Sequence, residues 1–156
     1  MPEYVYQLED PNDIIDCADL IAEHREAVPT GHIGQFGPSR KYYTALLEAG
    51  ILTCIGVRYD GELVGYALAI LDESHHNPGT ILAHVDCIYV QPEHRPNAGR
   101  KLMIVLDSYL ESQGVHAVHH QVMARGRDFG PALVRRGYEK HATVYCKQLG
   151  KQLESN

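Results

Sequence analysis

Tryptophan is absent from this 156-residue chain, phenylalanine occurs only twice, and acidic residues outnumber basic ones by 20 to 14. The resulting net charge of -6 argues against a broad nucleic-acid surface, because such a surface needs a basic stripe to displace counterions. No apolar run is long enough to span a bilayer, and the N-terminus lacks a basic region followed by an apolar stretch. We therefore expect no membrane partner and, by default, a cytoplasmic protein.

Paired cysteine motifs are also missing. The chain has four cysteines without CxxC spacing, three of them inside apolar runs: Cys17, Cys54, Cys87 and Cys146. This pattern favours buried, reduced thiols over a disulfide framework or a zinc site. Histidine is plentiful, with ten residues, but His119 and His120 are neighbours in an expected strand and point to opposite faces. We therefore expect no metal site.

The remaining composition is typical of a single globular domain. Hydrophobic residues make up 44% of the sequence and charged residues 22%. A chain of this length can bury a core without disulfides or metals. We expect one domain over residues 1–150 and a polar tail over residues 151–156.

The hydrophobic period switches between strand and helix along the chain. Alternating or β-rich runs predict strands at residues 5–9, 51–59, 62–71, 80–90, 115–123 and 137–149. Helical spacing predicts helices at residues 11–28, 39–50, 98–113 and 129–136, the first of them capped by Asp10 or Asn12. Asp60-Gly61, between two β-rich runs, is a strong hairpin signal. This order predicts an α/β domain with a mixed sheet.

Positive charge is concentrated around one loop of this acidic chain. The stretch YVQPEHRPNAGRKL ends a strand and opens a helix that we expect from Ala98 or Gly99. A helix N-terminus carries unpaired NH groups and a partial positive charge, so it favours an anion. Arg95 and Arg100 could add charge-assisted bonds, and Asn97 could adopt the left-handed conformation. The alternative is a solvated connecting loop, since the stretch has neither the GK[ST] of a P-loop nor GxGxxG.

The element order and this loop resemble the GCN5-related N-acetyltransferase (GNAT) family over nearly the whole chain. IYVQPEHR is similar to the family's strand-to-helix junction, LVRRGYEK to its ending, and GRKL to its G-R-x-L. That alignment puts His94, Asn97 and Gly99 on the three positions of the family's pyrophosphate-binding pattern, with Gly99 the strict match. Within the family, the likeness is to phage-type or prophage-type members.

The resemblance implies a largely antiparallel, twisted sheet flanked by helices, in the order strand, helix, helix, three strands, helix, strand, helix, strand. It implies an acyl-CoA N-acyltransferase with acetyl-CoA as donor, and backbone donors on the fourth strand for the acetyl carbonyl and the pantetheine. The residues that the resemblance implies at the donor site are Ile88, Tyr89, Val90, His94, Arg95, Asn97, Ala98, Gly99, Arg100 and Lys101.

Acetyl transfer to an amine needs a base, donors at the carbonyl oxygen and a way to release the thiolate. In the strand LAHVDCIYV, a period of two puts His84 and Asp86 on one face. Asp86 also matches an acidic position of the family, so we expect it to be the base, directly or through water, with His84 second. The alternatives are that Asp86 pairs with a cation or caps a bulge and that His84 is a core histidine. Cys87 is expected on the face opposite His84, which argues against a covalent nucleophile.

The chain departs from the family's pattern at several positions. The family's frequent tyrosine acid falls at Leu133 or Val134, and a cofactor-contacting asparagine is replaced at Gly126 or Arg127. Pro96 removes one amide from the anion loop. A thiol with a pKa of about 8.5 leaves readily near neutral pH, so transfer need not be lost. The alternative is a catalytically weak or inactive GNAT-fold protein that acts as a CoA-binding or regulatory module.

Taken with the resemblance, these residues predict an enzyme that moves an acetyl group to a primary amine by direct attack in a ternary complex. The amine belongs to a small molecule or a protein, and the acidic balance favours a cationic acceptor. Side chains from the first two helices and from the loop before the fourth strand are expected to contact it: Glu23, His24, Tyr43, His75 and His76. Edge strands could pair two copies into a homodimer.

Overall fold

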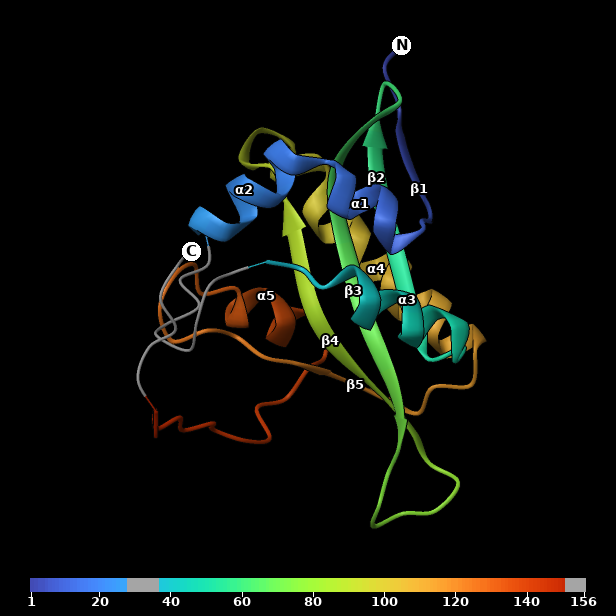
Figure 1. The fold of residues 1–156 in the computed structure, drawn as a ribbon, viewed down its shortest axis with the longest axis vertical. Helices are drawn as coiled ribbons and strands as arrows, with labels where there is room; N and C mark the ends of the chain where they lie inside the picture. The colour runs from blue at the N-terminus through green and yellow to red at the C-terminus, as the bar shows by residue number, and fades with distance from the viewer. Residues whose placement is uncertain (28–36, 151–156) are drawn as a thin grey trace.

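A five-stranded sheet with helices on both faces forms the body of the protein (Figure 1). The computed structural model describes residues 1–27 and 37–150. The strands are β1 (Tyr4–Leu8), β2 (Leu52–Tyr59), β3 (Glu62–Glu73), β4 (Ile81–Val90) and β5 (Ala117–His120). The helices are α1 (Pro11–Asp16), α2 (Ala18–Ala27), α3 (Arg40–Glu48), α4 (Arg95–Ser112) and α5 (Gly130–Arg135), with a short 3-10 turn, η1 (Pro92–His94), before α4. No helix within these residues has both the length and the apolar character needed to cross a bilayer.

The strands lie in the sheet in their sequence order, and the first four form an antiparallel meander. Among the described strands only the β4–β5 pair is parallel, and α4 makes the crossover between them. Asp60 and Gly61 have φ angles of 49° and 84°, the left-handed pair that a two-residue hairpin between β2 and β3 requires. The structure confirms the mixed, largely antiparallel sheet and the Asp60-Gly61 hairpin.

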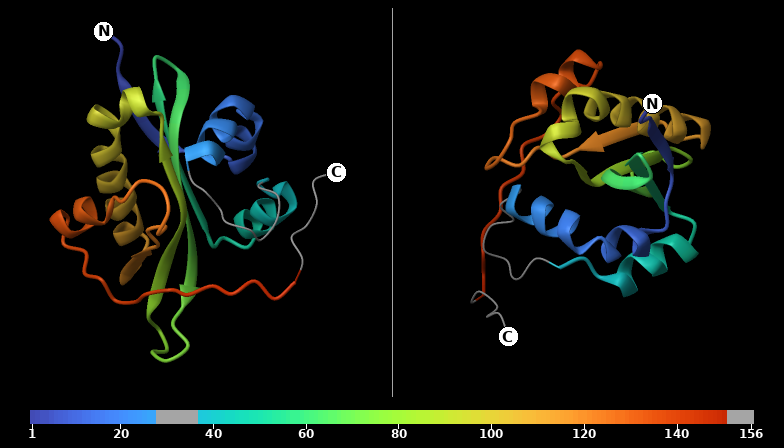
Figure 2. Two further views of the ribbon diagram at one scale, coloured as in Figure 1. Left: turned by 90° about the vertical axis from the view of Figure 1, so that its left-hand side faces the viewer. Right: turned by 90° about the horizontal axis from the view of Figure 1, so that it is seen from above.

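Helix α4 lies on one face of the sheet together with α5, and α1, α2 and α3 lie on the other (Figure 2). Leu102, Leu106 and Leu110 recur every four residues, so they share one side of α4. All three are 0% exposed and belong to one buried cluster with Val57 and Ala67 of the sheet. The buried residues of the cluster on the α4 face are therefore all aliphatic.

The opposite face is covered by α1, α2 and α3, and the buried cluster there includes two tyrosines. Asp10 caps α1 by accepting a hydrogen bond from the Asn12 amide at 2.8 Å, and Ser39 caps α3 by accepting one from the Tyr42 amide at 3.2 Å. The buried core of this face consists of Ile14, Leu20, Cys54, Tyr66, Leu68 and Tyr89. Because α1 to α3 are short, this face leaves room for a pocket.

Two helices differ from the sequence-based prediction. The helix expected over residues 11–28 is divided at Cys17, whose ψ of 71° lies outside the helical region, and residue 28 lies outside the described residues. Helix α4 begins at Arg95 rather than at Ala98 or Gly99, because the η1 turn runs directly into it. Of the loop expected over residues 29–40, residues 29–36 lie outside the described residues, as does the tail expected over residues 151–156.

The last expected strand is the largest difference. Residues 137–149 have the alternation of a strand, but the structure has no strand there, and the strand expected over residues 115–123 is shortened to β5. A strand needs a neighbour to satisfy its NH and C=O groups, and none lies beside residues 139–149 within the described chain. Cys146 is exposed in this segment, so the prediction of buried thiols is wrong for it, whereas Cys54 is buried.

Candidate active site

A β-bulge in β4 determines which side chains face the pocket. In the pairing of β3 with β4, Leu68 lies opposite Cys87 and Ala69 lies opposite Val85, which leaves Asp86 without a partner. A bulge inserts one extra residue into one strand and resets the alternation of side chains beyond it. As a result, Asp86 and Cys87 both line the same pocket.

The bulge also corrects the expected position of Cys87. Its partner Leu68 and the partner of His84, Ile70, are two residues apart on β3, so Cys87 and His84 lie on the same face. The sequence argument from alternation was wrong here. Burial nevertheless raises the pKa of the Cys87 thiol, and the nearby Asp86 carboxylate adds to that rise, so the thiol stays protonated and is a poor nucleophile.

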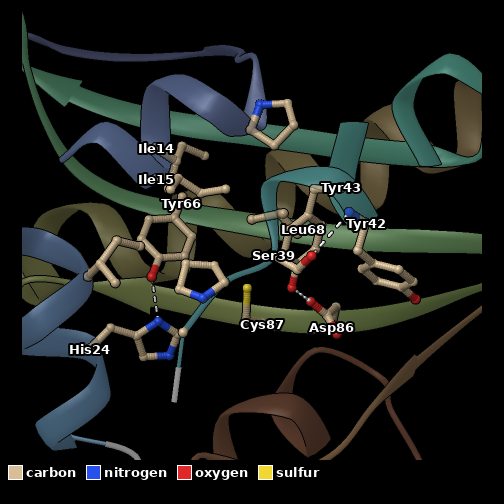
Figure 3. A pocket seen from close by; sticks show the side chains of 14 residues that line it. Ile14, Ile15, His24, Ser39, Tyr42, Tyr43, Tyr66, Leu68, Asp86 and Cys87 are labelled. Carbon is tan, nitrogen blue, oxygen red and sulfur yellow. Dashed lines mark hydrogen bonds between the residues drawn. The ribbon is translucent and has the colours of Figure 1, made fainter. Parts of the chain in front are cut away.

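The pocket has a volume of about 270 Å³ and lies between the sheet and the helices α1, α2 and α3 (Figure 3). Aliphatic and aromatic side chains form most of its wall, and Asp86 is the only acidic residue among the described residues that line it. The lining residues are Pro11, Ile14, Ile15, Ile21, His24, Gly37, Pro38, Ser39, Tyr42, Tyr43, Tyr66, Leu68, Asp86 and Cys87. The pocket can therefore hold an apolar group beside one carboxylate.

Tyr43 of α3 connects the helical layer to the bulge. Its Oη donates a hydrogen bond to Oδ2 of Asp86 at 2.5 Å, as Figure 3 shows. Burial raises the pKa of Tyr43 well above its usual value, and the hydrogen bond to Asp86 raises it further. Tyr43 is therefore protonated at neutral pH and holds the exposed Asp86 carboxylate in one orientation.

His24 of α2 closes the deep side of the pocket. Its Nδ1 is hydrogen-bonded to Tyr66 Oη, and its ring stacks on Tyr89 with 4.7 Å between centroids. The residue is 6% exposed, and burial lowers the pKa of His24 to about 4, although the Asp86 charge opposes this. Burial also raises the pKa of Tyr66. Near pH 7 the polar groups around Asp86 are therefore neutral.

The strands β4 and β5 separate immediately beyond the bulge. Their pairing runs from Leu82–Ala117 to Val85–His120, and no further pair follows within the described residues. The Gln91 amide donates to Val64 O at 2.9 Å, so the backbone of Gln91 faces β3. Because backbone groups alternate along a strand, the amides of Ile88 and Val90 face the opposite side, where β5 has left a gap.

The beginning of α4 lies next to this gap. Arg95 Nε donates to Val90 O at 2.8 Å, and its guanidinium lies 5.5 Å from the Tyr89 ring centroid. The His94 amide bonds to Gln91 O, the Arg95 amide bonds to Pro92 O, and Pro96 has no amide. Of the NH groups that were expected to bind an anion, those of His94 and Arg95 therefore already have acceptors, and Pro96 has none to offer.

The rest of the expected anion loop is the first turn of α4. Asn97, Ala98 and Gly99 are helical, and the prediction of a left-handed Asn97 is wrong, because Asp60 is the only non-glycine residue with positive φ in the described chain. Arg100 and Lys101 are exposed, and their side chains make no hydrogen bond or ion pair within residues 1–27 and 37–150. These two cations remain available to an anionic ligand.

Other predicted site residues have different surroundings. His94 Nδ1 is hydrogen-bonded to Tyr4 Oη at 2.9 Å, which fixes its ring against β1. Glu23 accepts a hydrogen bond from Gln91 Nε2 at 3.1 Å and so joins α2 to the turn before α4. His84 is exposed, and its ring centroid lies 5.0 Å from that of His119.

Of the predicted substrate contacts, Glu23 does not line the pocket, and neither do His75 and His76. The two histidines lie in the loop at the tip of the β3–β4 hairpin, at the lower end of Figure 1. The structure instead joins Asp86, Tyr43 and His24. Sequence reasoning missed Tyr66, whose place in the strand ELVGYALAIL gives only burial, not which face it occupies. No cluster of three or more His, Cys, Asp or Glu side chains suited to a metal occurs in the described part of the chain.

A family model described as the acetyltransferase (GNAT) family matches residues 15–138, which include the bulge, the start of α4 and, apart from Pro11 and Ile14, the described residues that line the pocket. The chain belongs to the GNAT acetyltransferase family. It is therefore an acyl-CoA N-acyltransferase, and acetyl-CoA is its acyl donor. Ile88, Val90, Arg100 and Lys101, which were expected at the donor site, all lie within the matched residues.

Solved structures of acetyltransferases share this GNAT fold. Ribosomal-protein-alanine N-acetyltransferase from Brucella melitensis biovar Abortus 2308 has a TM-score of 0.72 at 21% identity, covering 95% of this chain and 100% of that chain. Aminoglycoside acetyltransferase meta-AAC0020 from an uncultured soil metagenomic sample, in complex with trehalose, has 0.71 at 15% identity, covering 94% and 97%. AAC(6')-Iy in complex with the bisubstrate analogue CoA-S-monomethyl-acetylneamine has 0.65 at 14% identity, covering 94% and 99%. A comparison with curated protein sequences gives no significant match.

Proposed function

We propose that this GNAT enzyme transfers the acetyl group of acetyl-CoA to a primary amine by direct attack within a ternary complex, with Asp86 as the base. The observation that carries the proposal is the position of Asp86. Its carboxylate lines the pocket on one side, and the β4 backbone next to it borders the gap left by β5. An amine in the pocket and a thioester in the gap would meet at this point.

Asp86 acts directly or through one water. A primary amine is an ammonium ion at neutral pH, and it must lose a proton before its nitrogen can attack a carbonyl carbon. Asp86 accepts that proton, while the Tyr43 hydroxyl keeps the carboxylate oriented through the 2.5 Å hydrogen bond. His84 precedes Asp86 on the same strand and is the second candidate for the base.

The amides of Ile88 and Val90 are the proposed donors to the carbonyl oxygen. Preorganised backbone donors stabilise the negative charge that this oxygen gains as the amine adds. The carbon–sulfur bond then breaks and the thiolate takes up a proton. No tyrosine occupies Leu133 or Val134, but a thiol with a pKa of about 8.5 is a good leaving group near neutral pH.

The pocket favours an amine attached to an apolar or aromatic group. Its wall is mainly aliphatic and aromatic, and Asp86 is the only carboxylate among the described lining residues. A polycationic acceptor would bring several ammonium groups to this single carboxylate, and burying the unpaired ones would be costly. We therefore expect an aryl-alkyl amine to be a better substrate than an aminoglycoside.

Initial-rate kinetics with a panel of amines test this function. Thiol release is followed while acetyl-CoA and the amine are varied, using 2-phenylethylamine and an aminoglycoside as the two extremes. A ternary complex gives intersecting double-reciprocal lines, and the aryl-alkyl amine should have the higher kcat/KM. Parallel lines, which are typical of a covalent acetyl-enzyme, would contradict direct attack.

Calorimetric titration with acetyl-CoA separates binding from transfer. Arg100→Glu should weaken binding, because it reverses a charge proposed to contact phosphate, while Lys41→Glu makes the same change on the exposed surface of α3 and should not. Equal affinity of both variants for acetyl-CoA would show that Arg100 does not contact the donor. Tight binding without turnover of any amine would favour the CoA-binding or regulatory alternative.

A further inference from the structure

Two histidines lie side by side across the parallel pair of strands. In the register of β4 against β5, His84 lies directly opposite His119, and their ring centroids are 5.0 Å apart. Alternation along β5 separates His119 from His120, because neighbours in a strand point to opposite faces. It does not prevent a pair of imidazoles whose second ring comes from the adjacent strand, and the sequence argument against a metal site did not consider such a pair.

The spacing of these two rings is the spacing that a shared metal ion requires. A zinc–imidazole bond is about 2.0–2.1 Å long, which puts the ion roughly 3.2 Å from the ring centroid. Two rings bound to one ion at a tetrahedral angle then have centroids about 5 Å apart, the separation that His84 and His119 already have. Rotation about the Cβ–Cγ bond turns a ring nitrogen toward the ion with little movement of the centroid. The backbone therefore needs no change to bring both rings to one ion.

Both rings are also accessible and suited to bind a cation. His84 and His119 are exposed, so an ion and its water ligands can reach them. Histidine binds a metal through the lone pair of its neutral ring. Partial desolvation lowers the pKa of His119, and the charges that His84 and His141 carry when protonated lower it further. His119 is therefore a neutral ligand near pH 7.

We propose that His84 and His119 form a binding site for one divalent transition-metal ion of the class of Zn²⁺, Ni²⁺ and Cu²⁺. Imidazole nitrogens are preferred ligands of these ions. Within residues 1–27 and 37–150 no third His, Cys, Asp or Glu side chain completes the pair, so water supplies the remaining ligands. An ion with only two protein ligands exchanges with the solution, unlike an ion enclosed in a structural four-ligand site.

The location of the pair gives the bound ion a structural effect. The pair lies directly before Val85 and His120, where the pairing of β4 with β5 ends. β5 is held to β4 by only four residue pairs, and the ion would take one ligand from each of these strands. A ligand that binds only the folded protein stabilises it in proportion to the logarithm of its concentration. The ion would thus strengthen the shortest pairing in the described sheet.

Calorimetric titration of the tag-free protein with ZnCl₂ gives the first test. We expect one ion per chain and binding weaker by at least about 10-fold in His84→Gln and in His119→Gln, because even the loss of a residue that only orients a ligand costs about 10- to 100-fold. The double variant His75→Gln/His76→Gln is the matched control, since it removes two exposed histidines at the hairpin tip, and it should bind zinc as the wild type does. Circular dichroism shows that each variant is folded. The proposal is overturned if the wild type shows no saturable binding, or if either His84→Gln or His119→Gln binds as the wild type does.

Electron paramagnetic resonance with Cu²⁺ identifies the ligands directly. The wild type should show couplings from two imidazoles, and each single variant should show one. Hydrogen exchange gives the structural effect, because zinc should slow the amides of β5 in the wild type and leave them unchanged in His119→Gln. A wild-type spectrum with one imidazole or with a sulfur ligand would overturn the shared site, as would zinc protection of β5 that persists in His119→Gln.

Discussion

The two faces of the sheet share the same strands, yet the buried cluster on one face is entirely aliphatic, whereas the other face carries the pocket that Asp86 lines. On the α4 face, Leu102, Leu106 and Leu110 are fully buried in an aliphatic cluster. On the face covered by α1, α2 and α3, the side chains surround Asp86 at the bulge. The contrast indicates that the residues that stabilise the fold and the residues proposed to act in catalysis lie on opposite faces of the sheet.

The protonation states of four side chains on the pocket face explain why a single carboxylate, Asp86, can determine the charge of the pocket. Burial lowers the pKa of His24 to about 4 and raises the pKa of Cys54 to about 12, and it raises those of Tyr43 and Tyr66 as well. All four groups are neutral near pH 7. Asp86 is then the charged group to which an ammonium would be drawn.

The largest expected effect is on the pocket face. Asp86→Asn should lower kcat/KM by about 10²- to 10⁴-fold, because an amide cannot accept the ammonium proton. The free energy of unfolding, measured in urea, should stay within about 1 kcal/mol of wild type, since Asp86 is exposed. Asp72→Asn, an exposed carboxylate on β3, is the control and should leave both quantities unchanged. Full activity of Asp86→Asn across the pH range would show that Asp86 is not the base.

The opposite pattern is expected on the α4 face. Leu106→Ala should lower the free energy of unfolding by about 2–5 kcal/mol, because it leaves a cavity in a fully buried cluster. The kcat per folded molecule should be unchanged at a temperature where the variant remains folded. Leu47→Ala on α3, where the side chain is 40% exposed, should cost much less. If Leu106→Ala abolished activity in the folded protein, the separation of the two faces would be wrong.

A pH titration of stability compares one histidine from each side of the sheet. Burial lowers the pKa of both His24 and His120 to about 4, against 6.5 when unfolded. Between about pH 4 and 6.5 the unfolded chain binds more protons, so the free energy of unfolding rises with pH through this window. Each histidine should contribute up to about 3 kcal/mol of this rise. His24→Gln and His120→Gln should each reduce the slope, and a flat profile for wild type would contradict the burial of both rings.

The smallest expected effect concerns the hydroxyl that orients the carboxylate. Tyr43→Phe removes the hydrogen bond to Asp86 and should lower kcat/KM by about 10- to 100-fold, in keeping with about 1.5–3 kcal/mol for a bond to a charged group. Tyr42→Phe changes a neighbouring ring that also lines the pocket and is 50% exposed, so it serves as the matched control. Equal activity of the two variants would mean that Tyr43 does not position Asp86.

Features that depend on adjacent residues could be predicted from the sequence. Asp60 and Gly61 determine their hairpin because both accept positive φ, and Asp10 caps α1 because its side chain reaches the second amide beyond it. The GNAT resemblance predicted a mixed, largely antiparallel sheet, which the structure confirms, and the acyl donor, which the family match supports.

Features that depend on pairing could not be predicted in this way. The bulge at Asp86 exists only in the register of β4 against β3, so alternation along β4 alone misplaced Cys87. The start of α4 was placed one turn too late, because the η1 turn supplies partners for the amides of His94 and Arg95. Residues 137–149 have the pattern of a strand, but no pattern along one chain reveals whether a neighbouring strand is present.

The only parallel pair among the described strands, β4–β5, is also the shortest pairing in the sheet. The hairpins β2–β3 and β3–β4 close over short connections, whereas β5 pairs with β4 across the longer connection that contains α4. β5 adds only four residue pairs, so it is the strand held by the fewest backbone contacts. The wall that flanks the proposed donor gap is thus expected to exchange its amide hydrogens sooner than the inner strands do, and the proposed passage for acetyl-CoA lies beside the strand with the fewest paired residues in the described sheet.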